Sequence, residues 1–493
     1  MSPFVIIGDD SLKSESAMDK NKNTVLSKKN LILLLVFNFL FALVLYSPIL
    51  NAFFIFDELS LISQCDPNQG KSWIDCLLPI INGFWRPLML LSGRTLLTLF
   101  GYNPVPFHVF PIMLFSVCSV LTSMLGARMG LSRAWCFSSS FLLIAHFGAF
   151  PAVSQLGNVN DLFLSASILC GILAFDSWVK IRKTQAWILV CFLVSLASKE
   201  TGVIFPAILV LWSLRYKGEC LKRNTKILFG ALFLVSLLSV VKTMLLQKVS
   251  LHTYMMDERL GFSLKAFIRQ GADYIFSMIF PFIHIAQFPF FPIRLPHVVL
   301  WMIRGGIFVV SAVVFIGALI NNNKRDWGIL LAMAYVAVFF PSLLNTAPEG
   351  RFIFSALPFM VLLLCLILRR LKGKLLYGGV AIVCAIWLLF VMGFFRSHTV
   401  TGYTKLSRDV EVFIDQAKKA APAWKKGDHI TVFNHPHPGG FWRWSYCQQL
   451  FNIFVPEPRV TLVLDRITSK TTHAYRYESS RLKEIEIPRQ ESR

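Results

Sequence analysis

The sequence has few charged residues for its length. Asp, Glu, Lys and Arg make up 15% of the 493 residues, whereas soluble globular chains contain about 25%. Hydrophobic residues make up 55%, and many of them fall in uninterrupted runs of the length that crosses a bilayer. The shortage of charge excludes an ordinary soluble protein and predicts an α-helical, polytopic membrane protein.

The ten cysteines include no CxxC pair, so the sequence offers no cysteine-based zinc or redox motif. Cys65 and Cys76 fall in a segment expected outside the membrane, where a disulfide and two free thiols are both open alternatives. A repeat of solenoid period is also missing. No cleavable signal peptide is expected, because the first thirty residues are polar and the apolar run after them is long enough to remain as an anchor.

Acidic residues are scarce relative to basic ones, and the formal net charge is +22. In a soluble chain such a charge would suggest nucleic acid as the partner. Here Lys and Arg lie mostly in short loops between apolar runs, where they set the orientation of the helices. The basic charge therefore predicts membrane topology, with membrane lipids and not nucleic acid as the surroundings.

The loop charges predict about eleven transmembrane helices. Residues 1–30 are polar and aperiodic, which predicts a disordered cytoplasmic tail. The transmembrane domain covers 31–395, with large outer loops at 55–104 and 248–300. The alternation places 396–493 on the periplasmic or lumenal side of a bacterial inner membrane or the endoplasmic reticulum.

Three stretches have distinctive patterns. Arg86, Leu90 and Arg94 recur every four residues, which predicts an amphipathic helix on the membrane from Pro87 to Phe100. Two apolar runs, 186–197 and 201–214, are each shorter than the roughly 20 residues that cross a bilayer. Lys199 and Glu200 separate these runs, so we expect them below the outer surface or in a water-filled cavity.

The C-terminal region differs in composition from the rest of the chain. Residues 410–420 show a helical pattern, whereas 430–433 and 460–464 show the pattern of strands separated by turn residues. We therefore expect a small α/β region outside the membrane.

Charged residues form four clusters that the topology places on the outer side. The clusters are Asp57 with Glu58, Arg86 with Arg94, Lys199 with Glu200, and Glu349 with Arg351. A single charge near a helix end often only snorkels or caps the helix. Together, however, the clusters supply a carboxylate base for a nucleophile and cations that hold a departing phosphate.

Three motifs follow one another along the chain. They are Trp85-Arg86-Pro87-Leu88 with Arg94, then Ser198-Lys199-Glu200-Thr201-Gly202, then Glu349-Gly350-Arg351-Phe352-Ile353-Phe354. His146 followed by Asp161, and His108, match parts of two further motifs. With the acidic pair after the first helix, this order resembles the GT-C glycosyltransferase superfamily, and within it the protein O-mannosyltransferase-like branch. It is similar to the transmembrane TPR-containing O-mannosyltransferases, without the TPR repeats.

The resemblance implies that Asp57 is the catalytic carboxylate, which deprotonates or orients an acceptor during a single inverting displacement. Glu58 is the second catalytic candidate, and which of the two carboxylates is the base stays open. Glu58 is otherwise a helper or, with Asp57, a ligand of a divalent metal, Mg or Mn; no cofactor is certain. The phosphate of the donor is assigned to Arg86, Arg94, Lys199 and Arg351. Supporting roles are assigned to Glu200, Asp161, Glu349, His108 and His146.

Each assignment has a structural alternative. Asp57 could be a solvated helix end, Lys199 and Glu200 an internal ion pair at a turn, and Asp161 a helix cap. For the whole chain, the leading hypothesis is transfer of a sugar from a polyprenyl-phosphate carrier to a glycan, lipid or protein acceptor. The alternatives are a transporter or lipid flippase, and a membrane assembly protein without activity.

Overall fold

The computed structural model describes most of the N-terminal helices and the core of the C-terminal region. It covers residues 26–55, 57–77, 85–181, 184–216, 223–254, 325–344, 354–370, 401–426, 428–433, 453–455, 461–464, 473–478 and 481–484. Nearly all of the predicted tail and most of the predicted outer loop 248–300 lie outside the described residues.

Helices dominate the part of the chain that is described. Four helical runs are long and apolar enough to cross a membrane: Lys28–Ile49, Pro104–Arg128, Leu156–Val179 and Thr225–Lys242. The prediction of a mostly helical chain with several apolar helices is confirmed.

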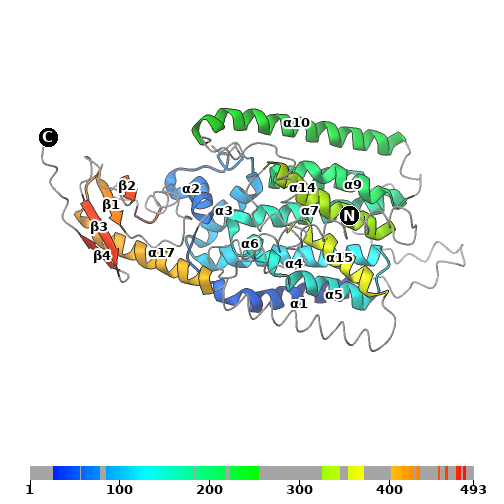
Figure 1. Ribbon diagram of the computed structural model, residues 1–493, viewed down its shortest axis with the longest axis horizontal. Helices are drawn as coiled ribbons and strands as arrows, with labels where there is room; N and C mark the ends of the chain where they lie inside the picture. Colours follow the sequence, from blue (N-terminus) through cyan, green and yellow to red (C-terminus); the bar gives the residue numbers. More distant parts are fainter. Residues whose placement is uncertain are drawn as a thin grey trace, which may run out of the picture.

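The helices of the bundle lie side by side in Figure 1. They are α1 (Lys28–Tyr46), α4 (Pro104–Arg128), α5 (Arg133–Ile144), α7 (Val159–Ile181), α8 (Gln185–Ser198), α9 (Phe205–Ser213), α10 (Arg223–Tyr254), α14 (Arg325–Leu344) and α15 (Leu357–Leu368). Helix α4 contacts α1, α5 and α7, and α7 also contacts α8. Asn103 caps α4 by accepting a hydrogen bond from Val105 N–H at 3.1 Å. Gly130, with φ of 75°, turns the chain between α4 and α5.

The chain breaks between α8 and α9, as the two short apolar runs predict. Lys199 is extended, with φ −156° and ψ 150°, and a short 3-10 helix, η6 (Glu200–Ile204), leads into α9. A Cβ atom on Gly202 would lie 2.2 Å from the carbonyl oxygen of Ser195. Only glycine allows this approach of η6 to α8, and the approach fixes where Lys199 and Glu200 emerge.

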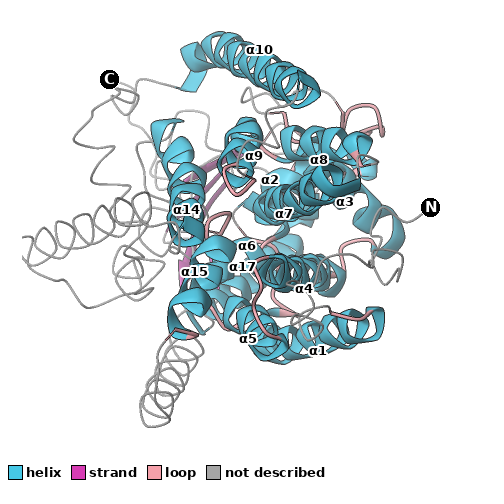
Figure 2. Ribbon diagram, turned by 90° about the vertical axis from the view of Figure 1, so that its right-hand side faces the viewer, coloured by secondary structure: helices cyan, strands magenta, loops and turns pink. Residues whose placement is uncertain are grey.

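Helix α10 lies at the edge of the bundle, away from α1 and α5 (Figure 2). Leu234, Leu237 and Leu238 of this helix are 57%, 61% and 59% exposed. A helix with so apolar an exposed surface would be unfavourable in water. The exposed leucines therefore fit a face that contacts lipid.

The segment after α1 carries the first acidic and basic clusters. Helix α2 (Asp57–Cys65) packs against α3 (Pro87–Phe100), and α3 occupies the residues predicted for the amphipathic helix. A 3-10 turn, η3 (Pro67–Gln69), follows α2. Tyr102 donates a hydrogen bond to Asp66 at 2.6 Å, which ties the end of α3 back to this turn.

The C-terminal region lies at the opposite end of the molecule from the α4–α5 turn, and α17 (Thr401–Ala420) joins it to the bundle (Figure 1). Its sheet has the order β2-β1-β3-β4. The strands are β1 (His429–Phe433), β2 (Thr461–Leu464), β3 (His473–Glu478) and β4 (Arg481–Glu484). Strand β1 is parallel to β2 and β3, whereas β3 and β4 are antiparallel. The pattern of the sequence predicts strands only at the positions of β1 and β2.

We expect the tight packing of α7 on α9 to make Gly171 of α7 intolerant of a side chain. A Cβ atom there would lie 2.3 Å from the Phe205 ring, whereas a Cβ atom on Gly230 of α10 meets nothing within 4 Å. Overpacking a core costs about 1–3 kcal/mol, and Gly to Ala in an open helical position gains about 0.5–1 kcal/mol. In thermal unfolding of the purified protein in detergent, Gly171→Ala should unfold below the wild type. The matched control, Gly230→Ala, should unfold at or slightly above it. Equal unfolding temperatures for the two variants would contradict this packing.

Candidate functional site

Arg86 and Glu200 form a bidentate ion pair between two distant segments. Arg86 is the N-cap residue of α3, and Glu200 begins η6. Arg86 Nη2 lies 2.8 Å from Glu200 Oε1, and Arg86 Nε lies 3.1 Å from Glu200 Oε2. Both side chains are largely buried, at 17% and 11% exposure. Two parallel N–H···O bonds fix the guanidinium in one orientation.

Trp85 fixes the backbone just before Arg86. Its indole N–H donates to the carbonyl oxygen of Leu77 at 2.9 Å. Lys242 of α10 places its ammonium 4.6 Å from the centre of the Trp85 ring, a cation–π contact. Trp85, the residue before Arg86, is therefore fixed by contacts with both the outer loop and α10.

Lys199 and Asp161 form a second ion pair, which is buried. Lys199 Nζ lies 2.6 Å from Asp161 Oδ1, and each residue is 2% exposed. Asp161 lies in the first turn of α7, where the helix dipole also favours a negative charge. Removing one partner of a buried pair leaves an uncompensated charge, so the two residues depend on each other.

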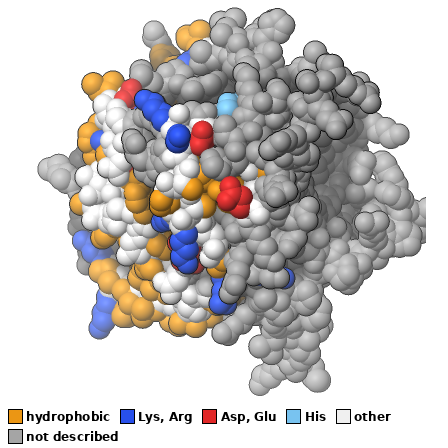
Figure 3. Space-filling view, turned by 90° about the vertical axis from the view of Figure 1, so that its left-hand side faces the viewer, with side chains coloured by type: hydrophobic (Ala, Val, Ile, Leu, Met, Phe, Trp, Pro, Cys, Tyr) orange, Lys and Arg blue, Asp and Glu red, His pale blue; other side chains and the backbone are white. Residues whose placement is uncertain are grey.

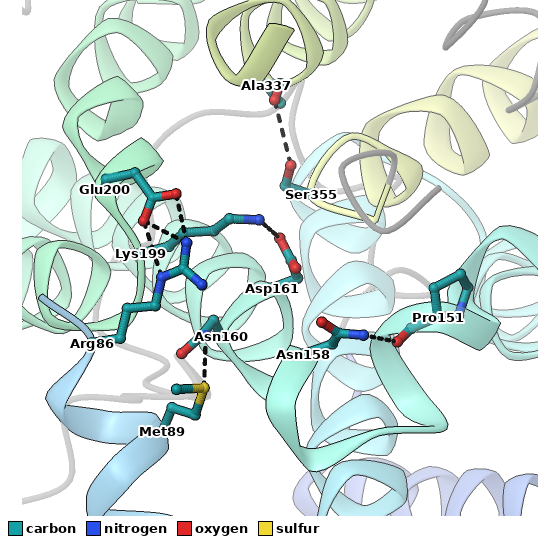
Figure 4. A network of polar contacts seen from close by, with 10 residues as sticks. All are labelled: Arg86, Met89, Pro151, Asn158, Asn160, Asp161, Lys199, Glu200, Ala337 and Ser355. Atoms are coloured by element: carbon teal, nitrogen blue, oxygen red, sulfur yellow. Dashed lines mark hydrogen bonds and ion pairs between the residues drawn. The ribbon is translucent and has the colours of Figure 1, made fainter. Parts of the chain in front are cut away.

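The two ion pairs make one cluster, shown in Figure 4. We call Arg86, Glu200, Lys199 and Asp161 the ion-pair cluster; its formal charge sums to zero. The neighbours Lys199 and Glu200 each form an ion pair with a residue of another segment, Lys199 with Asp161 and Glu200 with Arg86.

Unsatisfied polar atoms lie beside the ion-pair cluster. Asn160 donates to the sulfur of Met89 at 3.1 Å. Within the described part of the chain, however, Asn160 Oδ1 and Thr201 Oγ1 are buried and find no hydrogen-bond partner. Buried polar atoms are normally satisfied. Asn160 lies beside the cluster in Figure 4, and Thr201 follows Glu200 directly in the chain, so both atoms belong to the segments that form the cluster.

The acidic pair, Asp57 and Glu58, forms the start of α2. Asp57 begins α2, and its side chain lies outside the described residues. Glu58 is fully buried and accepts hydrogen bonds from the backbone N–H groups of Leu156 at 3.1 Å and Ile55 at 3.2 Å. The bond from Leu156 therefore ties α2 to η5 (Leu156–Asn158), the 3-10 turn that leads into α7.

Arg94 lies two turns along α3 from Arg86 and contacts a different part of the protein. Its Nη1 donates to the carbonyl oxygen of Cys65 at 3.2 Å, and its guanidinium lies 5.5 Å from the centre of the Trp73 ring. Arg94 thereby braces the outer loop. Cys65 and Cys76 are both buried as free thiols, and burial raises the pKa of the Cys65 thiol.

Both predicted histidines hold backbone turns. His108 of α4 lies 3.0 Å from the carbonyl oxygens of Ser154 and Ala52 through its two ring nitrogens. His146 Nδ1 accepts a hydrogen bond from Gly148 N–H at 3.0 Å. Glu349 and Arg351 lie outside the described residues. Among the residues that are described, no group of three or more His, Cys, Asp or Glu side chains could hold a metal ion.

The structure thus brings together Arg86, Lys199, Glu200 and Asp161 from three separate parts of the chain. The other predicted residues whose side chains are described make separate contacts with the backbone. They are Glu58, Arg94, His108 and His146. Sequence reasoning missed Asn160 and Met89 beside the ion-pair cluster. Asn160 precedes Asp161 directly, and its position at the start of an apolar helix was the available signal.

Comparison with known proteins finds limited similarity, and no family model matches the chain. An alignment over 178 residues, which covers 33% of this chain, shows 28% identity to the protein O-mannosyl-transferase Tmtc1 of Drosophila melanogaster. The match confirms the resemblance to an O-mannosyltransferase, although the alignment spans only 20% of the length of Tmtc1.

Two crystal structures of ArnT from Cupriavidus metallidurans, one bound to undecaprenyl phosphate and one in the apo state, each align with a TM-score of 0.48 and 14% identity. The alignments cover 89% and 88% of this chain, respectively, and 86% of the ArnT chain in both.

Loss of Lys199 should destabilise the fold by leaving the Asp161 carboxylate buried without its counter-charge. Lys199→Met should cost about 3–5 kcal/mol, and adding Asp161→Leu should recover much of the loss, since an apolar pair can replace a buried ion pair. The measurement is the free energy of unfolding in detergent. The control is Lys71→Met in the exposed outer loop, which should change stability by less than about 0.5 kcal/mol. If Lys199→Met were as stable as Lys71→Met, the buried pair would not stabilise the fold.

Proposed function

We propose that this chain is an integral membrane glycosyltransferase of the GT-C type, with about eleven transmembrane helices, which moves a sugar from a polyprenyl-phosphate carrier to an acceptor. The observation that carries the proposal is the meeting of Arg86, Lys199 and two carboxylates in one largely buried cluster. The three segments involved are the ones whose motifs resemble the O-mannosyltransferase-like branch or, for Asp161, partly match it. The partial match to Tmtc1 supports the same class.

The ion-pair cluster suits a leaving group whose charge grows. A sugar linked through a phosphodiester carries one negative charge, and the released polyprenyl phosphate can carry two. Arg86 and Lys199 supply donors for these oxygens, and Arg351 is proposed as a third. N–H donors that are already oriented interact more strongly with phosphate oxygens as the negative charge on those oxygens grows. We therefore expect Arg86 and Lys199 to stabilise the more highly charged transition state more than the bound donor.

Asp57 is proposed as the base. The acceptor oxygen forms a bond to the anomeric carbon while the bond from that carbon to the phosphate oxygen breaks. The acceptor proton passes to Asp57, and the polyprenyl phosphate leaves with the bonding electron pair. Glu58 is proposed as a helper that holds α2, because its carboxylate oxygens already accept backbone hydrogen bonds from Ile55 and Leu156.

The proposed reaction takes place on the periplasmic or lumenal side, with the N-terminus in the cytoplasm. Figure 3 shows basic and acidic side chains close together on the described surface at the sheet end of the molecule. Charged groups avoid the hydrocarbon of a bilayer, which supports a position of this end in water. The acceptor there would be a protein, a glycan or another lipid.

Replacing the proposed base should abolish transfer without unfolding the protein. With purified protein in lipid nanodiscs, a panel of polyprenyl-phosphate sugars should yield one donor that is consumed. For that donor, Asp57→Asn should lower kcat by roughly 100-fold or more, since positioned acid–base groups contribute about 10²–10⁴-fold.

The matched control is Asp75→Asn, which removes another carboxylate of the same outer loop. Hydrogen bonds from Ser72 lower the pKa of Asp75, so this exposed group is ionised, but it only caps a local turn. Its variant should retain wild-type kcat. Consumption of no donor by the wild type, or equal kcat for Asp57→Asn and the wild type, would overturn the proposal.

A further inference from the structure

The start of α17 connects the C-terminal region to the segment that contains α2 and η5. Tyr403, in the first turn of α17, is 6% exposed. Its hydroxyl donates to the carbonyl oxygen of Ser154 at 3.1 Å. Burial, the charge of Glu58 and a hydrogen bond to Glu58 raise the pKa of Tyr403 well above its usual value. The hydroxyl therefore stays protonated, with the Ser154 carbonyl oxygen and the Glu58 carboxylate as its two acceptors.

These two acceptors belong to the two segments on which the proposed chemistry depends. Glu58 follows Asp57 directly in α2. Ser154 directly precedes Gln155 and η5, which continues into α7 with Asp161 in its first turn. Leu156 N–H already joins the two segments through Glu58. The Tyr403 hydroxyl adds a second link between them, from a residue far along the chain.

The ring of Tyr403 has a defined position. It meets the rings of Phe150 at 5.9 Å and His108 at 6.4 Å, both edge to face. His108 in turn approaches the same Ser154 carbonyl oxygen at 3.0 Å. A ring held on two sides leaves its hydroxyl little freedom to leave the Glu58 carboxylate.

A second, independent contact reaches the residues just before α2. Phe454 of the C-terminal region lies with its ring centre 4.8 Å from that of Phe53 and 6.3 Å from that of Phe54. It also lies 5.4 Å from the ring of Tyr102. Lys418 of α17 lies 5.9 Å from the centre of the Phe454 ring, which connects this contact to the same helix. The C-terminal region thus touches the chain on both sides of Asp57.

We propose that the C-terminal region is a structural part of the catalytic site, and that Tyr403 is the positioning residue through which it acts, by holding Glu58 and Ser154 together. The inference rests on the proposed function for its kinetic consequence, although the contacts do not. Because a displacement of about 1 Å can cost about 100-fold in rate, loosening the start of α2 should affect turnover more than donor binding.

Tyr403→Phe tests the inference, because it keeps the ring and removes only the hydroxyl. We expect kcat to fall by roughly 10-fold or more, with little change in KM for the donor. Hydrogen exchange, followed by mass spectrometry, should become faster in peptides containing Ile55 and Leu156, whose amides bond to Glu58. The unfolding temperature should remain near that of the wild type.

The matched control is Tyr475→Phe, which removes another tyrosine hydroxyl of the C-terminal region. That hydroxyl accepts a hydrogen bond from Trp424 at 2.9 Å, at the sheet and away from α2. Its variant should leave kcat and the exchange of both peptides unchanged. Tyr403→Leu removes the ring as well as the hydroxyl. If only the ring mattered, Tyr403→Phe would behave as the wild type and Tyr403→Leu alone would lose activity. That result would overturn the role of the hydroxyl.

A double-variant cycle with Glu58→Gln gives a further test. If Tyr403 acts through Glu58, the two changes should not add, because the second removes a link that is already broken. Additive effects would overturn the proposed route. If the wild type consumes no donor at all, the proposed function fails. Unchanged exchange in Tyr403→Phe would overturn the link between α17 and α2, whatever the activity.

Discussion

The arrangement of this protein depends on the need to neutralise charges buried in an apolar helical bundle. Lys199 and Asp161 are both 2% exposed, and neither charge could remain there without the other. Their pairing fixes the start of α7 relative to the break between α8 and α9. Arg86 and Glu200 then extend the same constraint to the start of α3. Three elements that are distant in sequence are thereby held at one point.

The geometry of the backbone makes this pairing possible. Lys199 is in an extended conformation between two helices, and Gly202 lets η6 approach the carbonyl oxygen of Ser195. In a continuous helix, the side chains of residues 199 and 200 would point about 100° apart, and the helix axis alone would set their directions. The break instead directs Lys199 to α7 and Glu200 to α3. The break gives up regular helical hydrogen bonds between α8 and α9, and it places the charges of Lys199 and Glu200 beside their partners.

The sequence predicts the parts of this arrangement that depend on local pattern. The lengths of the runs 186–197 and 201–214 predict the break, and the spacing from Arg86 to Arg94 predicts α3. Pairing between distant residues leaves no such pattern. Asp161 could be a cap or a site residue, and only its position opposite Lys199 at 2.6 Å shows the contact. The same limit applies to Tyr403, because nothing local relates it to Glu58, which lies far earlier in the chain.

Glu58 shows that a residue of a sequence motif can have a structural role. A pair of adjacent acids after a membrane helix suggests two equivalent carboxylates, but successive positions on a helix point about 100° apart. Glu58 is buried and accepts hydrogen bonds from two backbone N–H groups, which indicates a structural role. A carboxylate whose oxygens accept such bonds is poorly available to a substrate. This structural role makes Glu58 an attachment point for η5 and α17. Asp57, at the first position of α2, is the residue that we propose as the base, and the placement of its backbone depends on how firmly Glu58 is held.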